Sequence, residues 1–170
     1  FRVTEQAHVN VIKLSAPATR EFWEIPVLFE DEHLLALDKP AGLLTAPEGE
    51  DPAQVSLLRL LHDAIAAQKP WATQRGLTYL NILARLDAET SGVLLLAKTK
   101  PAFITLADQF GTEKPLQKFF ALIAGLPSSD RFEMDAKLSL LEGPLVMARV
   151  DSLNGKKCKS IFDVVEKFSG

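Results

Sequence analysis

The stretch that decides the fold is IPVLFEDEHLLALDKPAG, residues 25–42. Within it, two short apolar runs at residues 27–30 and 34–38 are joined by an acidic turn. Apolar runs of this length on either side of a polar turn are typical of a β-hairpin, and Pro40 with Gly42 marks the end of the second run. The stretch therefore predicts two adjacent antiparallel strands.

Two segments downstream of this hairpin have the apolar spacing of helices. Residues 54–67 place four apolar side chains on one helical face, those of Leu57, Leu58, Leu61 and Ile65. Residues 100–113 have Pro101 near their start and repeat apolar residues at helical spacing, with Gly111 as the predicted C-terminal stop. We therefore expect two helices, of which the first is amphipathic.

Further strands are predicted after the hairpin. Three apolar runs contain or have the length of single strands: residues 77–87, 92–98 and 116–127. The run at residues 92–98 starts with Gly and is uniformly apolar, which is typical of a buried strand. Residues 136–168 predict two or three antiparallel strands, with turns at residues 142–144 and at Asn154-Gly155, a dipeptide typical of hairpins.

Together these segments predict one mixed α+β domain. Because short hairpins dominate, we expect a largely antiparallel sheet with two or more flanking helices. Residues 1–24 predict an N-terminal connector or extension, although residues 8–14 alternate imperfectly as a strand would. Residues 25–170 predict the main domain. The chain of 170 residues does not begin with Met, which predicts that it is a piece of a longer protein.

Composition limits the classes of function. The net charge of −3 counts mildly against nucleic acid as a partner, because phosphate contacts need Lys and Arg. Basic residues nevertheless gather locally, at residues 98–100, 114–118 and 155–159. The single cysteine, Cys158, and three scattered histidines predict neither a zinc site nor a catalytic metal. One cysteine also favours a reducing, cytoplasmic location, and no apolar run approaches the roughly 18 residues of a membrane span.

The segment ARLDAETSGVLLLAKT, residues 84–99, places Asp87 between two apolar runs. Its local sequence leaves two interpretations open for Asp87. Asp followed by Thr-Ser-Gly is typical of a turn residue between strands. Alternatively, a carboxylate at a strand end needs a positive partner, and Arg85, two residues earlier, would share its face in a strand and make this a candidate site.

Four segments in order resemble the pseudouridine synthases of the RluA type, which act on ribosomal or transfer RNA. They are VLFEDEHLLALDKPAGLLTAP (27–47), LARLDAETSGVLLLAKT (83–99), ADQFGTEKPLQKFFALIAGLP (107–127) and GKKCKSIFDVVEKF (155–168). The most specific of the four contains the pattern RLDxxTSG. The resemblance covers roughly residues 25–168, most of the chain, and implies the fold of the family's catalytic domain.

The resemblance also implies an activity and a set of site residues. The family isomerises uridine in RNA to pseudouridine without a metal or an organic cofactor. Asp87 then matches the catalytic aspartate, which attacks the base or opens the glycosidic bond through the sugar. Arg85 matches the arginine that fills the space left by the flipped base, although an ion pair with a local acid such as Glu89 is the alternative. Phe120 matches the aromatic residue that packs on that base.

Three positions depart from the family pattern. Phe120 stands where the family usually has tyrosine, so this ring can stack but cannot transfer a proton. Ala84 replaces a common histidine, and the chain ends before the segment that carries the basic partner of the catalytic aspartate. We therefore expect a member truncated at its C-terminus.

Three functions follow as hypotheses. The leading one is an RNA pseudouridine synthase, a monomer in the cytoplasm with RNA as its partner and no membrane or metal. The second is a non-catalytic RNA-binding relative of the same fold. The third is a small α+β domain that binds a protein, with Asp87 serving only the turn.

Overall fold

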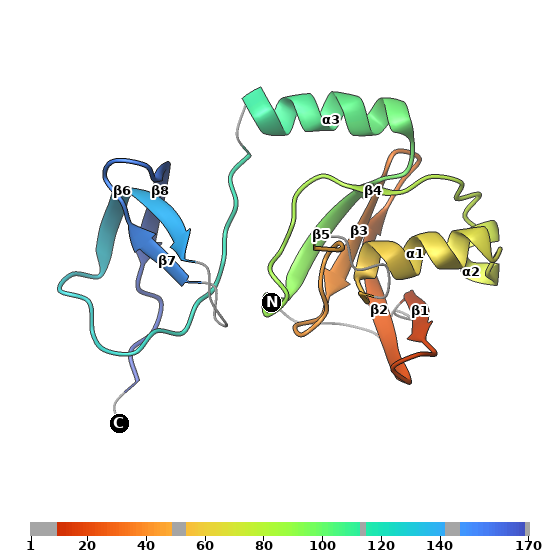
Figure 1. Cartoon of the computed structure of the whole chain (residues 1–170), viewed down its shortest axis with the longest axis horizontal. Helices are drawn as coiled ribbons and strands as arrows, with labels where there is room; N and C mark the ends of the chain where they lie inside the picture. The colour runs from red at the N-terminus through yellow and green to blue at the C-terminus, as the bar shows by residue number, and fades with distance from the viewer. Residues whose placement is uncertain (1–9, 49–53, 113–114, 142–146, 169–170) are drawn as a thin grey trace, which may run out of the picture. The chain divides into compact units, whose positions relative to one another are not determined.

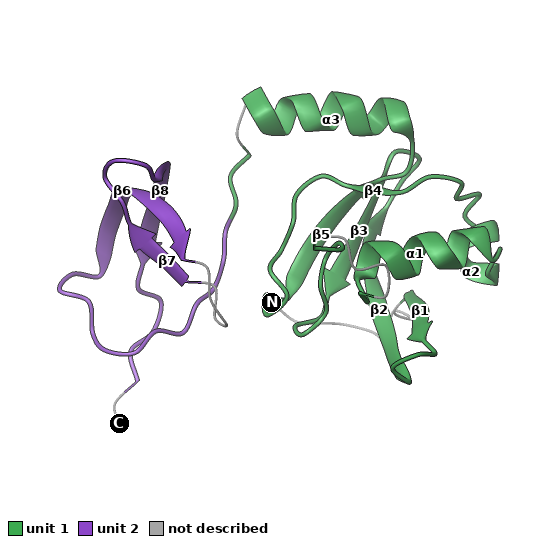
Figure 2. Cartoon of the chain, in the orientation of Figure 1, with its two compact units in different colours: residues 1–117 green, residues 118–170 purple. Residues whose placement is uncertain are grey.

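The structure, a computed structural model, describes residues 10–48, 54–112, 115–141 and 147–168. The chain divides into two compact units, Phe1–Gln117 and Lys118–Gly170 (Figure 2). No helix in the described part of the chain has the length and apolar character needed to cross a membrane.

A five-stranded sheet with the order β1-β2-β3-β5-β4 forms the first unit (Figure 1). Every neighbouring pair is antiparallel. The strands are β1 (Val11–Ala16), β2 (Glu21–Glu30), β3 (Leu34–Lys39), β4 (Asn81–Ile82) and β5 (Gly92–Ala97). Strand β1 and the first four residues of β2 therefore lie within residues 1–24, for which the sequence predicts a connector or extension.

The predicted hairpin is confirmed as β2 and β3. The Asp31 carboxylate accepts hydrogen bonds from the backbone amides of His33 and Leu34, at 2.8 and 2.7 Å, and so closes the turn between the strands. Val27 pairs with Leu37, and a bulge between Val27 and Phe29 shifts the register beyond it. The acidic turn is thus structurally required, since its carboxylate satisfies two backbone donors.

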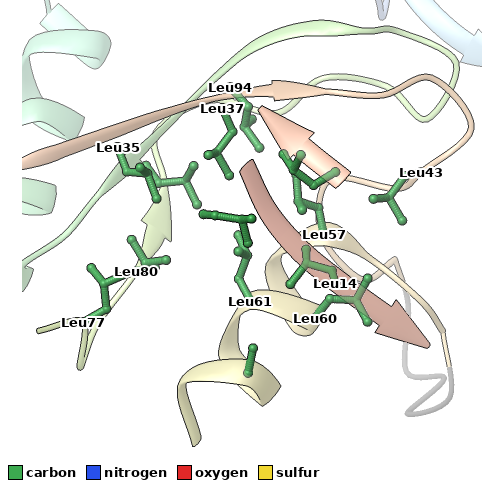
Figure 3. Close-up of a cluster of buried hydrophobic side chains, with 14 of the residues drawn as sticks. Leu14, Leu35, Leu37, Leu43, Leu57, Leu60, Leu61, Leu77, Leu80 and Leu94 are labelled. Atoms are coloured by element: carbon green, nitrogen blue, oxygen red, sulfur yellow. The ribbon is translucent and has the colours of Figure 1, made fainter. Parts of the chain in front are cut away.

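Helix α1 (Leu57–Ala66) closes the core of this unit against one face of the sheet. Its leucines meet leucines of β1, β3 and β5 in a single apolar cluster (Figure 3). Leu57 and Leu61 of the helix are completely buried, as are Leu35 and Leu37 of β3. Burial of each such side chain stabilises the fold by about 1.5–3 kcal/mol, so this cluster holds α1 and the three strands together.

Two more helices belong to this unit. Helix α2 (Pro70–Thr73) is one short turn, and α3 (Lys100–Thr112) confirms the second predicted helix. The predicted stop at Gly111 is wrong, because the helix continues through it to Thr112. Pro101 does lie in the first turn, where its missing N–H costs no helical hydrogen bond.

A network of ion pairs joins the end of β2 to two distant segments. The Glu30 carboxylate accepts from Arg75 Nε and from Lys98 Nζ, each at 2.9 Å, and all three side chains are at most 21% exposed. Arg75 also donates to Asn10 Oδ1 and to the Trp71 carbonyl. Burial alone would raise the pKa of Glu30, but the hydrogen bonds and charges of Lys98 and Arg75 outweigh it and hold this pKa below 4.5.

Glu30→Gln is expected to lower the free energy of unfolding by about 2 kcal/mol at neutral pH, because it leaves two half-buried cations without their carboxylate. The folded-state pKa of Glu30 is depressed, so its contribution is present above pH 4.5 and is lost as pH falls through the folded value. Urea titrations across that range measure it. Glu24→Gln, on the same strand but in an exposed pair with Lys13, should cost about 0.5 kcal/mol or less; equal losses would contradict the network's role.

The second unit is a three-stranded antiparallel sheet with the order β7-β6-β8. Its strands are β6 (Arg131–Leu141), β7 (Met147–Val150) and β8 (Lys156–Asp163). The sequence predicts two or three antiparallel strands here, and three are found. The turn predicted at residues 142–144 lies outside the described residues. Alternate positions of β6 and β8 give the sheet one largely apolar face, where Phe132 stacks on Phe162 with ring centroids 4.8 Å apart.

The hairpin predicted at Asn154-Gly155 is wrong, because β7 and β8 pair with opposite edges of β6. The connection instead turns on the Asp151 carboxylate, which accepts from the amides of Leu153 and Asn154 at 3.1 and 2.9 Å. Gly155 then crosses so close to β6 that a Cβ would come within 2.7 Å of the Lys137 carbonyl carbon. Glycine is therefore required for the close approach, not for a two-residue turn.

The strand predicted at residues 116–127 is also wrong, since these residues form no strand in the structure. Several of its large apolar side chains are strongly exposed: Leu116, Phe119, Phe120, Leu122, Ile123 and Leu126. Strand formation requires a neighbouring strand to satisfy the backbone, and none is paired with this segment among the described residues. The predicted fold class, mixed α+β with largely antiparallel sheets, is confirmed.

Candidate active site

Asp87 lies in the loop that connects β4 to β5 in the first unit. The loop turns at Ala88 and Glu89, where the Thr90 amide donates to the Asp87 backbone oxygen at 3.1 Å. Gly92 opens β5 with a φ of +124°, a conformation that favours glycine. Asp87 is therefore a turn residue, and its side chain is exposed to solvent and to any ligand.

The residue before Asp87 is fixed by a threonine 41 positions earlier in the chain. Thr45 Oγ1 donates to the Leu86 carbonyl at 2.5 Å and lies 3.3 Å from the Leu86 amide, which donates to it. Thr45 is 1% exposed. One buried hydroxyl thus satisfies both backbone groups of Leu86.

The residue after Asp87 is fixed by the end of β3. Ala88 O accepts from the Gly42 amide at 2.8 Å and from Lys39 Nζ at 3.2 Å. Lys39 is completely buried, and its ammonium also donates to the carbonyls of Pro40 and Leu43, at 2.8 and 2.5 Å. Burial lowers the pKa of Lys39, although the negative charges of Glu89 and Asp87 oppose that shift. Asp87 is thus held on both sides by residues 39–45.

Arg85 projects into solvent from the same loop. Its Nη2 donates to Glu48 Oε1 at 2.7 Å, and both side chains are at least half exposed. Arg85 is therefore ion-paired, but its partner is Glu48, 37 positions earlier in the chain, and not the local acid Glu89. Arg85 and Asp87, two of the predicted site residues, lie two positions apart in this loop, and both are exposed.

Phe120 belongs to the second unit, where its ring is 94% exposed and lies outside any strand. Its place beside Asp87 stays a prediction. The basic clusters predicted from sequence are partly neutralised: Lys98 pairs with Glu30, and Lys159 pairs with Glu133 at 2.8 Å. Lys137 and Lys157 stand directly opposite each other across β6 and β8.

An open pocket of about 460 Å³ lies between α1 and the segment before β4, away from the Asp87 loop. It is lined by His62, Ile65, Ala66, Thr78, Tyr79, Leu80 and Asn81. Its one imidazole already contacts the Leu80 carbonyl at 2.7 Å. No carboxylate lines this pocket.

Sequence reasoning missed the supporting residues Lys39, Thr45 and Glu48. The sequence did offer an indication for Lys39. A lysine at the end of an apolar strand and before Pro-x-Gly either extends into solvent or is buried and donates hydrogen bonds to the following turn. Its hydrogen bond to Ala88 spans 49 positions, and that of Arg85 to Glu48 spans 37. Local patterns carry no information about such pairings.

An exposed carboxylate on a rigid turn at a sheet end, with an arginine two residues before it, defines a candidate enzyme site of the nucleophile or general-base class. Comparison with protein families identifies the family to which this site belongs. Residues 33–170 match the family model of RNA pseudouridylate synthases. The chain belongs to this family.

Relatives from several bacteria agree with that assignment. The chain is 34% identical over 149 residues to the ribosomal large subunit pseudouridine synthase C of Vibrio cholerae, covering 84% of this chain and 41% of the relative. It is 34% identical over 146 residues to the protein of the same name from Escherichia coli, and 35% identical over 119 residues to the ribosomal large subunit pseudouridine synthase D of Zymomonas mobilis. The chain spans about two fifths of the length of these relatives.

Two solved structures share the fold. Human RNA pseudouridylate synthase domain containing 4 superposes with a TM-score of 0.58 at 20% identity, covering 78% of this chain and 51% of the human chain. Human RNA pseudouridylate synthase domain containing 1 superposes with a TM-score of 0.51 at 14% identity, covering 94% and 53%.

Proposed function

We propose that this chain carries the catalytic aspartate of an RNA pseudouridine synthase, with Asp87 in that role. The observation that supports it best is the Asp87 turn itself: an exposed carboxylate in the RLDxxTSG pattern, with both neighbouring residues fixed by hydrogen bonds from the buried side chains of Lys39 and Thr45. Membership of the family supports the reaction. The names of the relatives favour RNA of the large ribosomal subunit as substrate, with transfer RNA as the other candidate.

The isomerisation exchanges the bond that joins uracil to the sugar. The N1–C1′ bond of uridine breaks, a C5–C1′ bond forms, the hydrogen on carbon 5 leaves as a proton, and N1 takes up a proton. An aspartate is ionised at neutral pH and serves as a covalent nucleophile in this exchange. The uridine must leave the RNA stack, and a planar guanidinium such as Arg85 suits the vacated space, while Phe120 offers a face for the flipped base.

Tritium release from RNA labelled at carbon 5 of uridine tests this proposal. The chain, extended at its C-terminus by the segment that carries the basic partner of the aspartate, is expected to release tritium into water, with no dependence on added metal or cofactor. Binding that weakens steeply with salt but is accompanied by no release would favour the non-catalytic RNA-binding relative. Absence of RNA binding even at low salt would favour a protein-binding domain.

Glu48→Gln is expected to tighten RNA binding about two- to fivefold at low salt, because it frees Arg85 from an exposed ion pair worth up to about 1 kcal/mol. Fluorescence anisotropy with a labelled, uridine-containing RNA hairpin measures the affinity. Glu32→Gln removes the same charge from an exposed site paired with His33 and should change the affinity less. Weaker binding by Glu48→Gln would contradict a role for Arg85 in contacting RNA.

A further inference from the structure

We infer that Thr45 is a positioning residue for the reaction, which acts on Asp87 through the backbone of Leu86. The inference rests on the proposed function, in which Asp87 is catalytic. Thr45 lies in the loop after β3, far from Asp87 in sequence, and its side chain is almost fully buried. Thr45 therefore contacts the backbone of the Asp87 loop from the protein interior.

The hydroxyl of Thr45 makes a pair of contacts that leaves Leu86 little freedom. It donates to the Leu86 carbonyl at 2.5 Å and accepts from the Leu86 amide at 3.3 Å. A hydroxyl has one hydrogen to donate and lone pairs to accept with, so both contacts form at once. The carbonyl of Leu86 belongs to the peptide group that begins Asp87, and this contact therefore fixes the plane from which the Asp87 side chain departs.

Thr45 is itself anchored by the first turn of α1. The amide of Leu58 donates to the Thr45 carbonyl at 3.0 Å, and the amide of Leu57 donates to the Leu44 carbonyl at 2.8 Å. These are donors that a helix N-terminus leaves without intrahelical partners. Leu57 is completely buried in the core. Thr45 therefore connects the core helix to Leu86, the residue before Asp87, through hydrogen bonds on both sides.

Positioning of this kind has a measurable kinetic consequence. Displacing a reacting group by about 1 Å can cost on the order of 10²-fold in rate even when binding is unchanged. The isosteric change Thr45→Val removes both contacts to Leu86 and is expected to lower kcat about 10- to 100-fold with KM for RNA nearly unchanged. Thr45→Ser retains the hydroxyl and should recover most of the rate.

Ser56 supplies a matched control. Its hydroxyl is also completely buried, at the residue before α1, and among the described residues it has no hydrogen-bond partner. Ser56→Ala therefore removes a buried hydroxyl of the same loop-helix junction without touching Leu86. It is expected to leave kcat and KM unchanged.

Amide hydrogen exchange tests the inference without requiring turnover. In Thr45→Val the Leu86 amide is expected to exchange faster than in the parent chain and in Thr45→Ser, while the amides of β1 keep their protection and so report an intact fold. Unchanged exchange at Leu86 would overturn the inference, as would equal losses of kcat in Thr45→Val and Ser56→Ala. If the chain shows no tritium release at all, the proposed function fails and with it the kinetic role of Thr45, whereas exchange at Leu86 still decides whether Thr45 fixes this turn.

Discussion

Asp87→Asn is expected to reduce tritium release from uridine-labelled RNA by about 10³-fold or more, because the amide is neutral and is not a nucleophile in this chemistry. The substitution is nearly isosteric. The hydrogen bond that Asp87 contributes to the turn uses its backbone oxygen, which accepts from Thr90, so the turn should persist. Single-turnover measurements with enzyme in excess over RNA separate this loss of chemistry from any change in binding.

Glu89→Gln is the matched control for that prediction. Glu89 is an exposed carboxylate two residues away in the same turn, and like Asp87 it contributes negative charge near Lys39. We expect Glu89→Gln to retain activity within about twofold of the parent chain, since surface charges of this kind have small effects. Equal losses in the two variants would mean that the charge of the turn matters, and would remove Asp87 from its assigned role.

RNA affinity provides a second, independent check on Asp87. Replacing a carboxylate by an amide removes repulsion between the turn and the RNA phosphates, so Asp87→Asn should bind RNA at least as tightly as the parent chain. Anisotropy titrations at two salt concentrations measure this. Loss of binding together with loss of tritium release would point to a misfolded loop instead of a missing nucleophile.

The parts of the fold that sequence predicts well are those set by local chemistry. The β2–β3 hairpin follows from the Asp31 turn, whose carboxylate serves amides two and three residues away. Helix α1 follows from the spacing of its leucines, and β5 from its uniformly apolar run. In each case the signal and the structure it determines lie within a few residues of each other.

The incorrect predictions involve partners that are distant in sequence. Residues 116–127 have the composition of a strand, yet composition does not say whether a neighbouring strand is present to pair with them. Asn154-Gly155 has the composition of a hairpin, yet the chain passes close to β6 there. Glycine is needed because a Cβ at residue 155 would clash with the backbone of Lys137. The same limit applies to the site: Asp87 and Arg85 could be named from the sequence, whereas Thr45 and Glu48 contact that loop across 41 and 37 positions.

Lys39→Met is the substitution for which we expect the largest loss of stability, about 3 kcal/mol in the free energy of unfolding. The buried ammonium donates to three carbonyls, those of Pro40, Leu43 and Ala88, and leaving such groups unpaired costs about 1–3 kcal/mol each. Relief from burying a charge offsets part of this cost. Urea titrations measure the difference, and Lys13→Met, in an exposed pair with Glu24, should cost about 0.5 kcal/mol or less.

The pH dependence of that difference tests the electrostatics of Lys39. Burial lowers its folded-state pKa below 10.5, against the opposing charges of Glu89 and Asp87. As pH rises through the lowered value, the folded chain releases a proton that the unfolded chain keeps until 10.5, so the folded state gains stability in this window. The methionine variant has no group that titrates at this position. The difference in free energy of unfolding between the parent chain and Lys39→Met should therefore widen as pH approaches 10.5. A gap that narrows would mean that the folded site favours the ammonium, and that hydrogen bonds to the three carbonyls outweigh the cost of burying its charge.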